Sequence, residues 1–476
     1  MITAETKVKT HPLMIFKFTR RYVFILLLPL VRSILNYGVT GALSRLVIME
    51  SLLAFLILVV SVMRWLSFSV VFRDDCIIVD SGVLVRRHAV MPLEKISISY
   101  TERNLLLGFF GAVAARIDTD SGFRKKADFE IYFSRKAARV YETLIQPENS
   151  GVLSYHSKLS MGIVMALANA SAFTGLIVLA PAINRAGEIL GDRINSGLRD
   201  TISFATALIG TIVPPAATVI AIIFVAGFAV SFLLTFIRYI PFRLLESDNK
   251  ITAEHGFIAR HRAVINRESI NAVVINMPPV MRVLGFCWVG ISAAGYGKKR
   301  EESEVVLPAV NLRQANDFQL GIFDISSEDE FDLTCPRRML KRAVFMPLML
   351  IAVSIAAELV LMAIFNAFSG MIALIMSFIQ IVLLYLLSVR IYHQNHGGVT
   401  ISDGVIMRSY KRLTIKKMRV KKDKTCMLKV SQGPLERRYG ACKLAVTVRA
   451  EQPITLKATN LDKNETDRLI KRYFKA

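Results

Sequence analysis

The chain contains long apolar segments. Between them lie stretches in which apolar and polar residues alternate. Six apolar segments come in pairs, and a helix needs about 20 apolar residues to cross a bilayer. We therefore predict six transmembrane helices in three hairpins. The first segment is the weakest because it is short and contains Pro29 and Arg32. The segments are residues 22–35, 46–63, 159–183, 216–237, 343–365 and 370–389.

A β-type pattern follows each apolar pair and contains a repeated motif of glycine, apolar residues and arginine. Its copies are Gly82-Val83-Leu84-Val85-Arg86, Gly256-Phe257-Ile258-Ala259-Arg260 and Gly404-Val405-Ile406-Met407-Arg408. Because glycine accepts the positive φ of a tight hairpin, the motif predicts strand, turn and strand. A second glycine follows in each copy: Leu107-Gly108-Phe109, Leu284-Gly285-Phe286 and Tyr439-Gly440-Ala441. The spacing between the two glycines is 26, 29 and 36 residues, so we expect an internal triplicate with loops of variable length.

Each β unit ends in a predicted helix, which Ser134, Asn311 and Asn460 open. The boundaries follow from the alternation of the two patterns. We expect an N-terminus and hairpin at 1–71, β units at 72–149, 238–333 and 393–476, and hairpins at 150–237 and 334–392.

This arrangement resembles the bacterial membrane proteins that carry membrane-flanked pleckstrin-homology-like (PH-like) domains. The matching features are the glycine-to-arginine hairpin, the downstream Leu-Gly-Phe element and the closing helix. The resemblance implies a split β-barrel of about seven strands, capped by a C-terminal helix, for each unit. It also implies a smaller membrane protein with a single PH-like unit as a partner.

The flanking charges give an orientation. Basic residues gather on the β-unit side of the apolar segments, whereas the loop 184–200 carries both signs. By the positive-inside rule, both termini and all three β units face the cytoplasm of a bacterial plasma membrane. The five scattered cysteines, with no C-x-x-C, indicate neither disulfides nor zinc.

Charge is the main functional clue. The third β unit carries 20 Lys and Arg against 7 Asp and Glu, whereas the first two units are close to neutral. Its densest run predicts contact with anionic lipid headgroups, with a solvated charged face as the alternative. No RNA-reading aromatic motif accompanies the run, so nucleic acid is not expected. The residues are Lys411, Arg412, Lys416, Lys417, Arg419, Lys421, Lys422 and Lys424.

Five further residues are candidate functional groups. Arg86, Arg260 and Arg408 share a place in the repeated motif, so they form either a common anion site or solvated strand residues. Glu358 and Gln380 lie at similar depth in the third hairpin and are expected to hydrogen-bond. Such a pair either joins two helices or marks a transport or proton site.

Other chemistry is weakly represented. His393-x-x-His396 can share a helix face, but no further ligands converge on it, so no metal is expected. The segment 295–300 has the composition of a phosphate loop but is better explained as a charged hairpin turn. No nucleophile elbow, P-loop or dinucleotide fingerprint occurs, and no cofactor is expected.

The sequence thus predicts a non-enzymatic integral membrane protein. Its PH-like units act as a scaffold or lipid-sensing module at the inner leaflet, in envelope maintenance or stress resistance. The alternative is a transporter or lipid-moving protein that uses the six helices.

Overall fold

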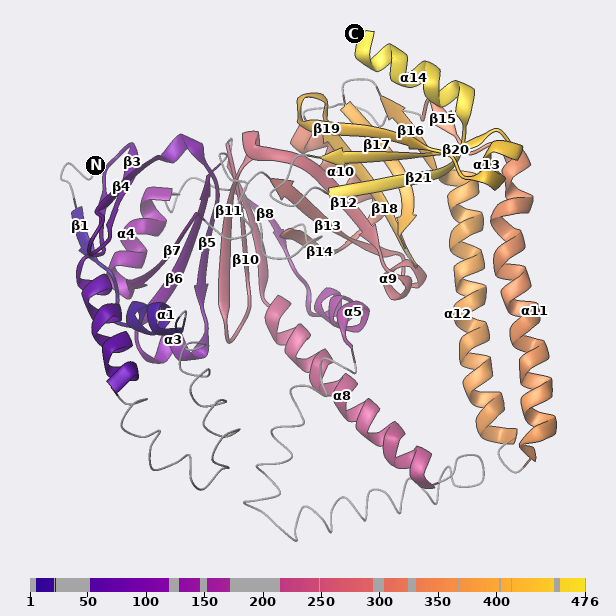
Figure 1. Cartoon of the computed structure of the whole chain (residues 1–476), viewed down its shortest axis with the longest axis horizontal. Coiled ribbons are helices and arrows are strands. Elements are labelled where there is room, and N and C mark those ends of the chain that lie inside the picture. Colours follow the sequence, from indigo (N-terminus) through magenta and orange to yellow (C-terminus); the bar gives the residue numbers. More distant parts are fainter. Residues whose placement is uncertain are drawn as a thin grey trace.

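We describe a computed structural model of the whole chain (Figure 1). The described residues are 6–20, 22, 52–119, 128–145, 152–171, 215–247, 249–293, 304–323, 331–366, 369–401, 404–411, 413–448 and 454–475.

The same order of elements occurs three times: four antiparallel strands, three antiparallel strands and a helix. We call these sets units 1, 2 and 3. In unit 1 the helix α4 (Arg135–Ile145) packs Tyr141 against Phe72 of the first sheet and Phe133 of the second. The strands of unit 1 are β1 (Thr6–Lys9), β2 (Ser69–Phe72), β3 (Cys76–Ser81), β4 (Arg87–Pro92), β5 (Ile96–Arg103), β6 (Ala112–Thr119) and β7 (Phe129–Ser134).

Unit 2 has its own core, closed by α10 (Leu312–Phe323), which buries Ala315 and Ile322. All eight residues of its strand β12 are buried, because this strand lies between two others in a sheet that is covered on both faces. The strands are β8 (Val152–His156), β9 (Phe242–Glu246), β10 (Lys250–His255), β11 (Arg260–Asn266), β12 (Ile270–Met277), β13 (Phe286–Ala293) and β14 (Glu304–Asn311).

Unit 3 is closed by α14 (Lys463–Lys475), whose Leu469 is buried in the core of that unit. The strands are β15 (Leu333–Thr334), β16 (Gly398–Ile401), β17 (Gly404–Lys411), β18 (Thr414–Lys421), β19 (Thr425–Ser431), β20 (Ala441–Val448) and β21 (Ile454–Asp462).

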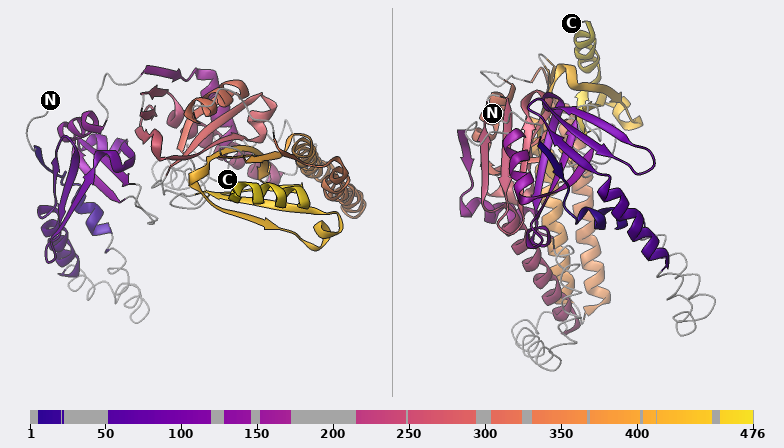
Figure 2. Two further views of the ribbon diagram at one scale, coloured as in Figure 1. Left: turned by 90° about the horizontal axis from the view of Figure 1, so that it is seen from above. Right: turned by 90° about the vertical axis from the view of Figure 1, so that its left-hand side faces the viewer.

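Neighbouring units share sheets. Strand β5 of unit 1 pairs antiparallel with β11 of unit 2, and β12 of unit 2 pairs antiparallel with β18 of unit 3. Two seven-stranded sheets result, each built from three strands of one unit and four of the next. The units therefore form a row with unit 2 in the middle (Figure 2).

The prediction of six transmembrane helices in three hairpins is wrong for the described part of the chain. Among the described residues, only α11 (Leu340–Ile364) and α12 (Ser369–His396) contain spans that meet both the length and the hydropathy expected of a membrane crossing, and each span is only 6% buried. Among the shorter described apolar segments, Leu52–Leu66 has 15 residues and extends about 23 Å at 1.5 Å per residue, less than the roughly 30 Å of a bilayer core.

The shorter apolar segments match three other predicted helices in part. They are Leu52–Leu66, α5 (Leu159–Asn169) and Ile223–Tyr239 of α8 (Pro215–Tyr239). The remainder of the predicted segments, residues 23–35, 46–51 and 172–183, lies outside the described residues. Helices α8, α11 and α12 leave the β units on one side (Figure 1).

The predicted unit boundaries also differ from the structure. Strand β1 pairs with β2, β8 with β9, and β15 with β16, although an apolar segment pair separates the partners in sequence each time. The apolar segments are therefore inserted after the first strand of each unit. Strands this short carry too little periodicity to be recognised before their partners are known.

The repeated motif is correct in two copies and out of register in the third. Gly82 and Gly256 have φ of +115° and +98° and lie in the turns before β4 and β11. Gly404 instead opens strand β17, so Arg408 lies within a strand and pairs with Gly398 and Lys417.

The prediction that Gly108 is the second turn glycine of the first copy is wrong; Gly111 takes that place. Gly111, Gly285 and Gly440 each have positive φ and each lie two residues beyond a short helix: α3 (Leu105–Phe109), α9 (Pro279–Val283) and α13 (Pro434–Arg438). Gly108 lies inside α3. With Gly111 as the equivalent residue, the spacing is 29 residues in both of the first two units, so the predicted drift in spacing is wrong there.

Candidate functional site

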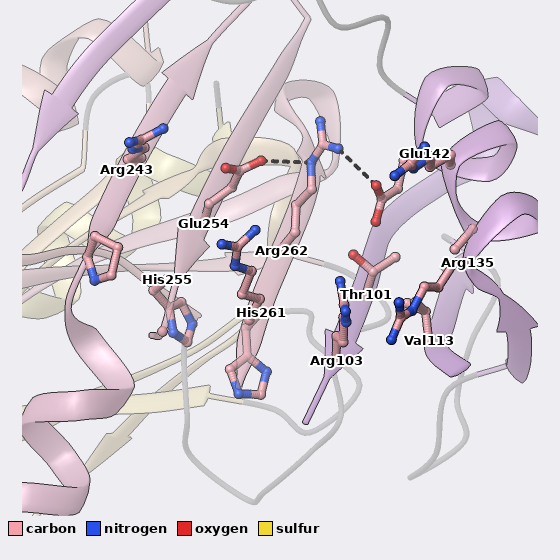
Figure 3. Close-up of a pocket in the computed structure, with 15 residues that line it drawn as sticks. Thr101, Arg103, Val113, Arg135, Glu142, Arg243, Glu254, His255, His261 and Arg262 are labelled. Atoms are coloured by element: carbon pink, nitrogen blue, oxygen red, sulfur yellow. Dashed lines mark ion pairs between the residues drawn. The ribbon is translucent and has the colours of Figure 1, made fainter. Parts of the chain in front are cut away.

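A pocket of about 360 Å³ lies where unit 1 meets unit 2 (Figure 3). Its lining carries six arginines and two glutamates, which gives a formal charge of +4 with neutral histidines. The arginines come from both units: Arg103, Arg135 and Arg139 from unit 1, and Arg243, Arg260 and Arg262 from unit 2.

The shared sheet supplies the floor of the pocket. Arg243, Glu254, Arg262 and Thr101 are register partners across four consecutive strands, β9, β10, β11 and β5. Side chains at paired positions point to the same face, so this row forms one strip. The strip exists only because β5 and β11 pair across the unit junction.

Helix α4 forms one wall, and one of its carboxylates binds the strip. Glu142 Oε2 lies 3.7 Å from Arg262 Nη1, while Glu254 Oε1 lies 3.1 Å from Arg262 Nε. Burial raises the pKa of Glu142, and the charge of Arg262 opposes that rise. Both carboxylates of the pocket are thus drawn to Arg262, which ties the two units together.

The other five arginines of the pocket are less neutralised by acidic side chains than Arg262 is. Arg135 donates to the Gly108 carbonyl at 2.6 Å. Within the described residues, Arg103, Arg139, Arg243 and Arg260 have no salt bridge to an acidic side chain. The pocket therefore presents guanidinium groups, which suit phosphate and carboxylate geometry.

One pair of these arginines is unusual. Arg260 and Arg103 are direct register partners in the β11–β5 pairing, and both are exposed. Like charges at opposed positions destabilise a sheet. A bound anion would remove that repulsion, so the pair favours an anion site.

The pocket adjoins the end of an apolar helix. Pro241, two residues beyond the end of α8, lines it. The β10–β11 turn is fixed to the last turn of α8, because Phe257 N donates to Ile237 O at 3.1 Å and His255 Nδ1 lies 3.0 Å from Arg238 O. This side of the pocket thus lies beside the end of α8.

Exposed apolar side chains surround this edge. In the turn before β11, whose Gly256 lines the pocket, Phe257 is 74% exposed. Helix α3, directly after Arg103, exposes Leu106 and Phe109. Solvent-facing apolar groups next to arginines are typical of a membrane interface.

The three arginines predicted from the motif have separate places. Arg260 lines the pocket. Arg86 is exposed in the turn between β3 and β4. The guanidinium of Arg408 lies over the ring of Phe331, 5.3 Å from its centroid. They do not form one common site.

The basic run of unit 3 is not a single face. Lys417 and Arg419 are buried on β18, and Lys417 Nζ donates to Asn316 Oδ1 at 3.1 Å. Lys424 Nζ lies 3.6 Å from Asp423. Lys416 and Lys421 are partly exposed on β18, whereas Arg412 and the side chains of Lys411 and Lys422 lie outside what the structure describes.

The pair predicted in the third hairpin is in contact, since Gln380 Nε2 donates to Glu358 Oε2 at 2.6 Å. His393 is buried with Nε2 3.3 Å from Thr459 O, and His396 lies beside Tyr392. Across the described ranges, no group of three or more His, Cys, Asp or Glu residues is placed to hold a metal ion. The five cysteines, all described, form no disulfide.

Sequence reasoning missed most of the pocket. Arg103, Arg139 and Arg243 lie in units whose charges nearly cancel, so the unit averages hide a local excess. The only signal was Arg260 in the repeated motif. The rest depends on the pairing of β5 with β11.

The fold and the pocket define a class: β units of four plus three strands with a closing helix, joined through their sheets. The sequence profile described as "Bacterial PH domain" matches residues 23–148 and 202–324, just over half of the chain. The chain belongs to this family. The pocket lies where the two matched segments meet.

One curated relative is the UPF0699 transmembrane protein YdbT of Bacillus subtilis (strain 168). It is 21% identical over 316 residues, which cover 60% of this chain and 62% of the relative. The match thus spans about three fifths of the relative's own length. No solved structure matches the chain.

Proposed function

We propose that this protein is a membrane-anchored, non-enzymatic scaffold whose β units lie on the inner leaflet and bind anionic lipid headgroups in the arginine-lined pocket. The opposed pair Arg103 and Arg260 is the observation that carries this proposal. These two arginines lie directly opposite each other on paired strands. Their guanidinium groups favour a ligand that places at least one negative charge between them.

The anchor is the hairpin α11–α12. A core helix of a soluble protein is mostly buried, whereas these spans are 6% buried. The membrane association of the Bacillus subtilis relative, as its name states, supports the same role for this chain. The flanking positive charges favour a cytoplasmic position for the β units, at the plasma membrane of a bacterium.

The position of the pocket favours a lipid over a free anion. One side of the pocket adjoins the end of α8, and the exposed Phe257 and Leu106, next to lining residues Gly256 and Arg103, suit insertion among acyl chains. The partners proposed for the chain are therefore anionic membrane lipids. A role in envelope maintenance or stress resistance fits a lipid-binding scaffold.

Binding to the full-length protein in detergent tests the proposal, with dihexanoyl phosphatidylglycerol as the anionic probe and dihexanoyl phosphatidylcholine as the neutral one. We expect saturable binding of the anionic lipid only, weakening as salt rises because charge contacts are screened. The double variant Arg103→Gln and Arg260→Gln should lower the affinity about a hundredfold or more, since it removes two charge-assisted hydrogen bonds that contribute about 1.5–3 kcal/mol each.

Arg313→Gln, on the exposed face of α10 and outside the pocket, is the matched control. It should bind like the parent. Equal binding of both lipids would refute the proposal. Inorganic phosphate competing as strongly as the lipid would identify a site for soluble anions instead.

A further inference from the structure

The two junctions inside the chain use the same strands of each unit. Strand β5 and its equivalent β12 each carry an irregularity in pairing at the second residue, between Ile96 and Ile98 and between Ile270 and Ala272. Strand β19 of unit 3 has the same irregularity between Thr425 and Met427. Thus β5, β12 and β19 are structural equivalents.

Their partners are equivalent as well. Strands β4, β11 and β18 each end the four-stranded half of a unit and are followed by a short 3-10 turn. Inside the chain β11 pairs with β5, and β18 pairs with β12. Strand β4 is the equivalent of β11 and β18 that has no partner in another unit, and β19 is the equivalent of β5 and β12 that has none. In the described residues each of these two strands pairs on one side only.

The register of the two junctions is identical. Ile98 faces Ile265 in the first, and Ala272 faces Val420 in the second. These are the same two positions in their units. Applied to the free strands, this register sets Met427 opposite Met91.

The free edges expose side chains whose equivalents are buried. Val90 of β4 is 52% exposed, whereas its equivalent Val264 in β11 is 8% exposed and lies in the core of unit 1. Met427 of β19 is 50% exposed, whereas its equivalents Ile98 and Ala272 are 3% and 0% exposed. The apolar residues for a third junction are thus present and uncovered.

We infer that β19 of one copy pairs with β4 of a second copy and joins the chains head to tail. The occupant is a second copy because one chain carries both halves of the junction at opposite ends of the row of units (Figure 2). Pairing in the internal register also keeps α8, α11 and α12 of both copies on the same side, as a shared membrane requires. Such a heterologous contact closes into a ring or extends as a filament.

The charges on the edges permit this pairing. Basic residues often protect an edge strand from association, and Arg87, His88 and Lys429 lie on these two strands. In the inferred register Lys429 faces Ala89 and Arg87 faces Ser431. No two like charges are opposed along this stretch, so charge repulsion does not oppose this register.

Cysteine crosslinking in native membranes tests the inference. Two full-length copies with different tags are co-expressed, both with Cys426→Ser because Cys426 is exposed. One copy carries Ala89→Cys and the other Lys429→Cys. We expect an oxidised heterodimer of the two tags. His88→Cys in place of Ala89→Cys is the register control, because a shift of one residue turns the side chain to the other face and should abolish the crosslink.

A second variant separates assembly from folding. Val90→Glu should reduce the crosslinked fraction about tenfold or more, because the junction would bury an unpaired carboxylate beside Leu428. Val90 is half exposed in the single chain, so the melting temperature should not change. Thr143→Glu, at an exposed position of α4, adds the same charge and should leave the crosslink intact.

Absence of the heterodimer would overturn the inference. So would equal crosslinking at positions 88 and 89, or an adduct of Lys429→Cys with a smaller protein in place of a second copy. Formation of the heterodimer is independent of lipid binding in the arginine pocket, so the two proposals can fail separately.

Discussion

Gln380 Nε2 donates to Glu358 Oε2 at 2.6 Å, and this hydrogen bond joins α11 to α12 along their apolar length. The acceptor needs no negative charge for the bond to form. An amide at position 358 can accept the same proton, whereas a methyl group cannot. Substitutions at position 358 can therefore distinguish a structural role of the carboxylate from a chemical one.

We predict that Glu358→Gln retains normal membrane levels and activity, while Glu358→Ala lowers stability by about 1 kcal/mol, the usual size of a hydrogen bond between membrane helices. Thermal unfolding in detergent and quantification in membranes measure both effects. If Glu358→Gln is stable but inactive in lipid binding or in a cellular assay, the carboxylate has a chemical role.

The turn glycine beside the pocket should be irreplaceable. Gly256 has φ of +98°, and a Cβ there would lie 2.0 Å from the backbone carbonyl oxygen of Ala259. Gly256→Ala should destabilise the protein by about 2 kcal/mol or more and weaken binding of anionic lipid. Gly321→Ala is the control, since no atom lies within 4 Å of the added Cβ in helix α10. It should be neutral or stabilising by up to about 1 kcal/mol.

Lys417 gives a pH-dependent prediction. Burial, aided by the charge of Arg419, lowers the pKa of Lys417 from 10.5 to about 8 in the folded protein. Between these values the unfolded chain binds more protons, so the contribution of Lys417 to stability increases as pH rises from about 8 to 10.5. Below pH 8 the buried charge persists in the fold.

Lys417→Met should therefore raise the melting temperature at pH 7, because an apolar side chain of similar length replaces a buried charge. The variant should also lose the increase in stability between about pH 8 and 10.5. Melting curves from pH 7 to 10 measure both effects. A lower melting temperature at pH 7 would show that the hydrogen bond from Lys417 to Asn316 outweighs the cost of burial.

Topology can be read by thiol labelling of intact cells. Ser196→Cys lies in the segment 184–200, for which the flanking charges predict an outward position, and Asn464→Cys lies at an exposed site of α14. A membrane-impermeant maleimide should label position 196 at once and position 464 only after permeabilisation. The reverse pattern would invert the proposed orientation.

The sequence alone determined the local features of this protein. Hydrophobic period and length identified α11 and α12, since a long uniform apolar run is itself a local signal. The similar depth of Glu358 and Gln380 in the predicted hairpin also gave their hydrogen bond correctly. The turns at Gly82 and Gly256 followed from glycine, the residue that adopts positive φ most readily.

Only the tertiary structure decided which strands belong together. Strand β8 pairs with β9 across a long insertion, and Gly404 proved to open a strand although its motif matches two turns. Periodicity reports whether a residue faces a core, but not which core or which neighbouring strand. The pairing of β5 with β11 is set by packing between residues far apart in sequence, and it is this pairing that places Arg103 opposite Arg260 and creates the pocket.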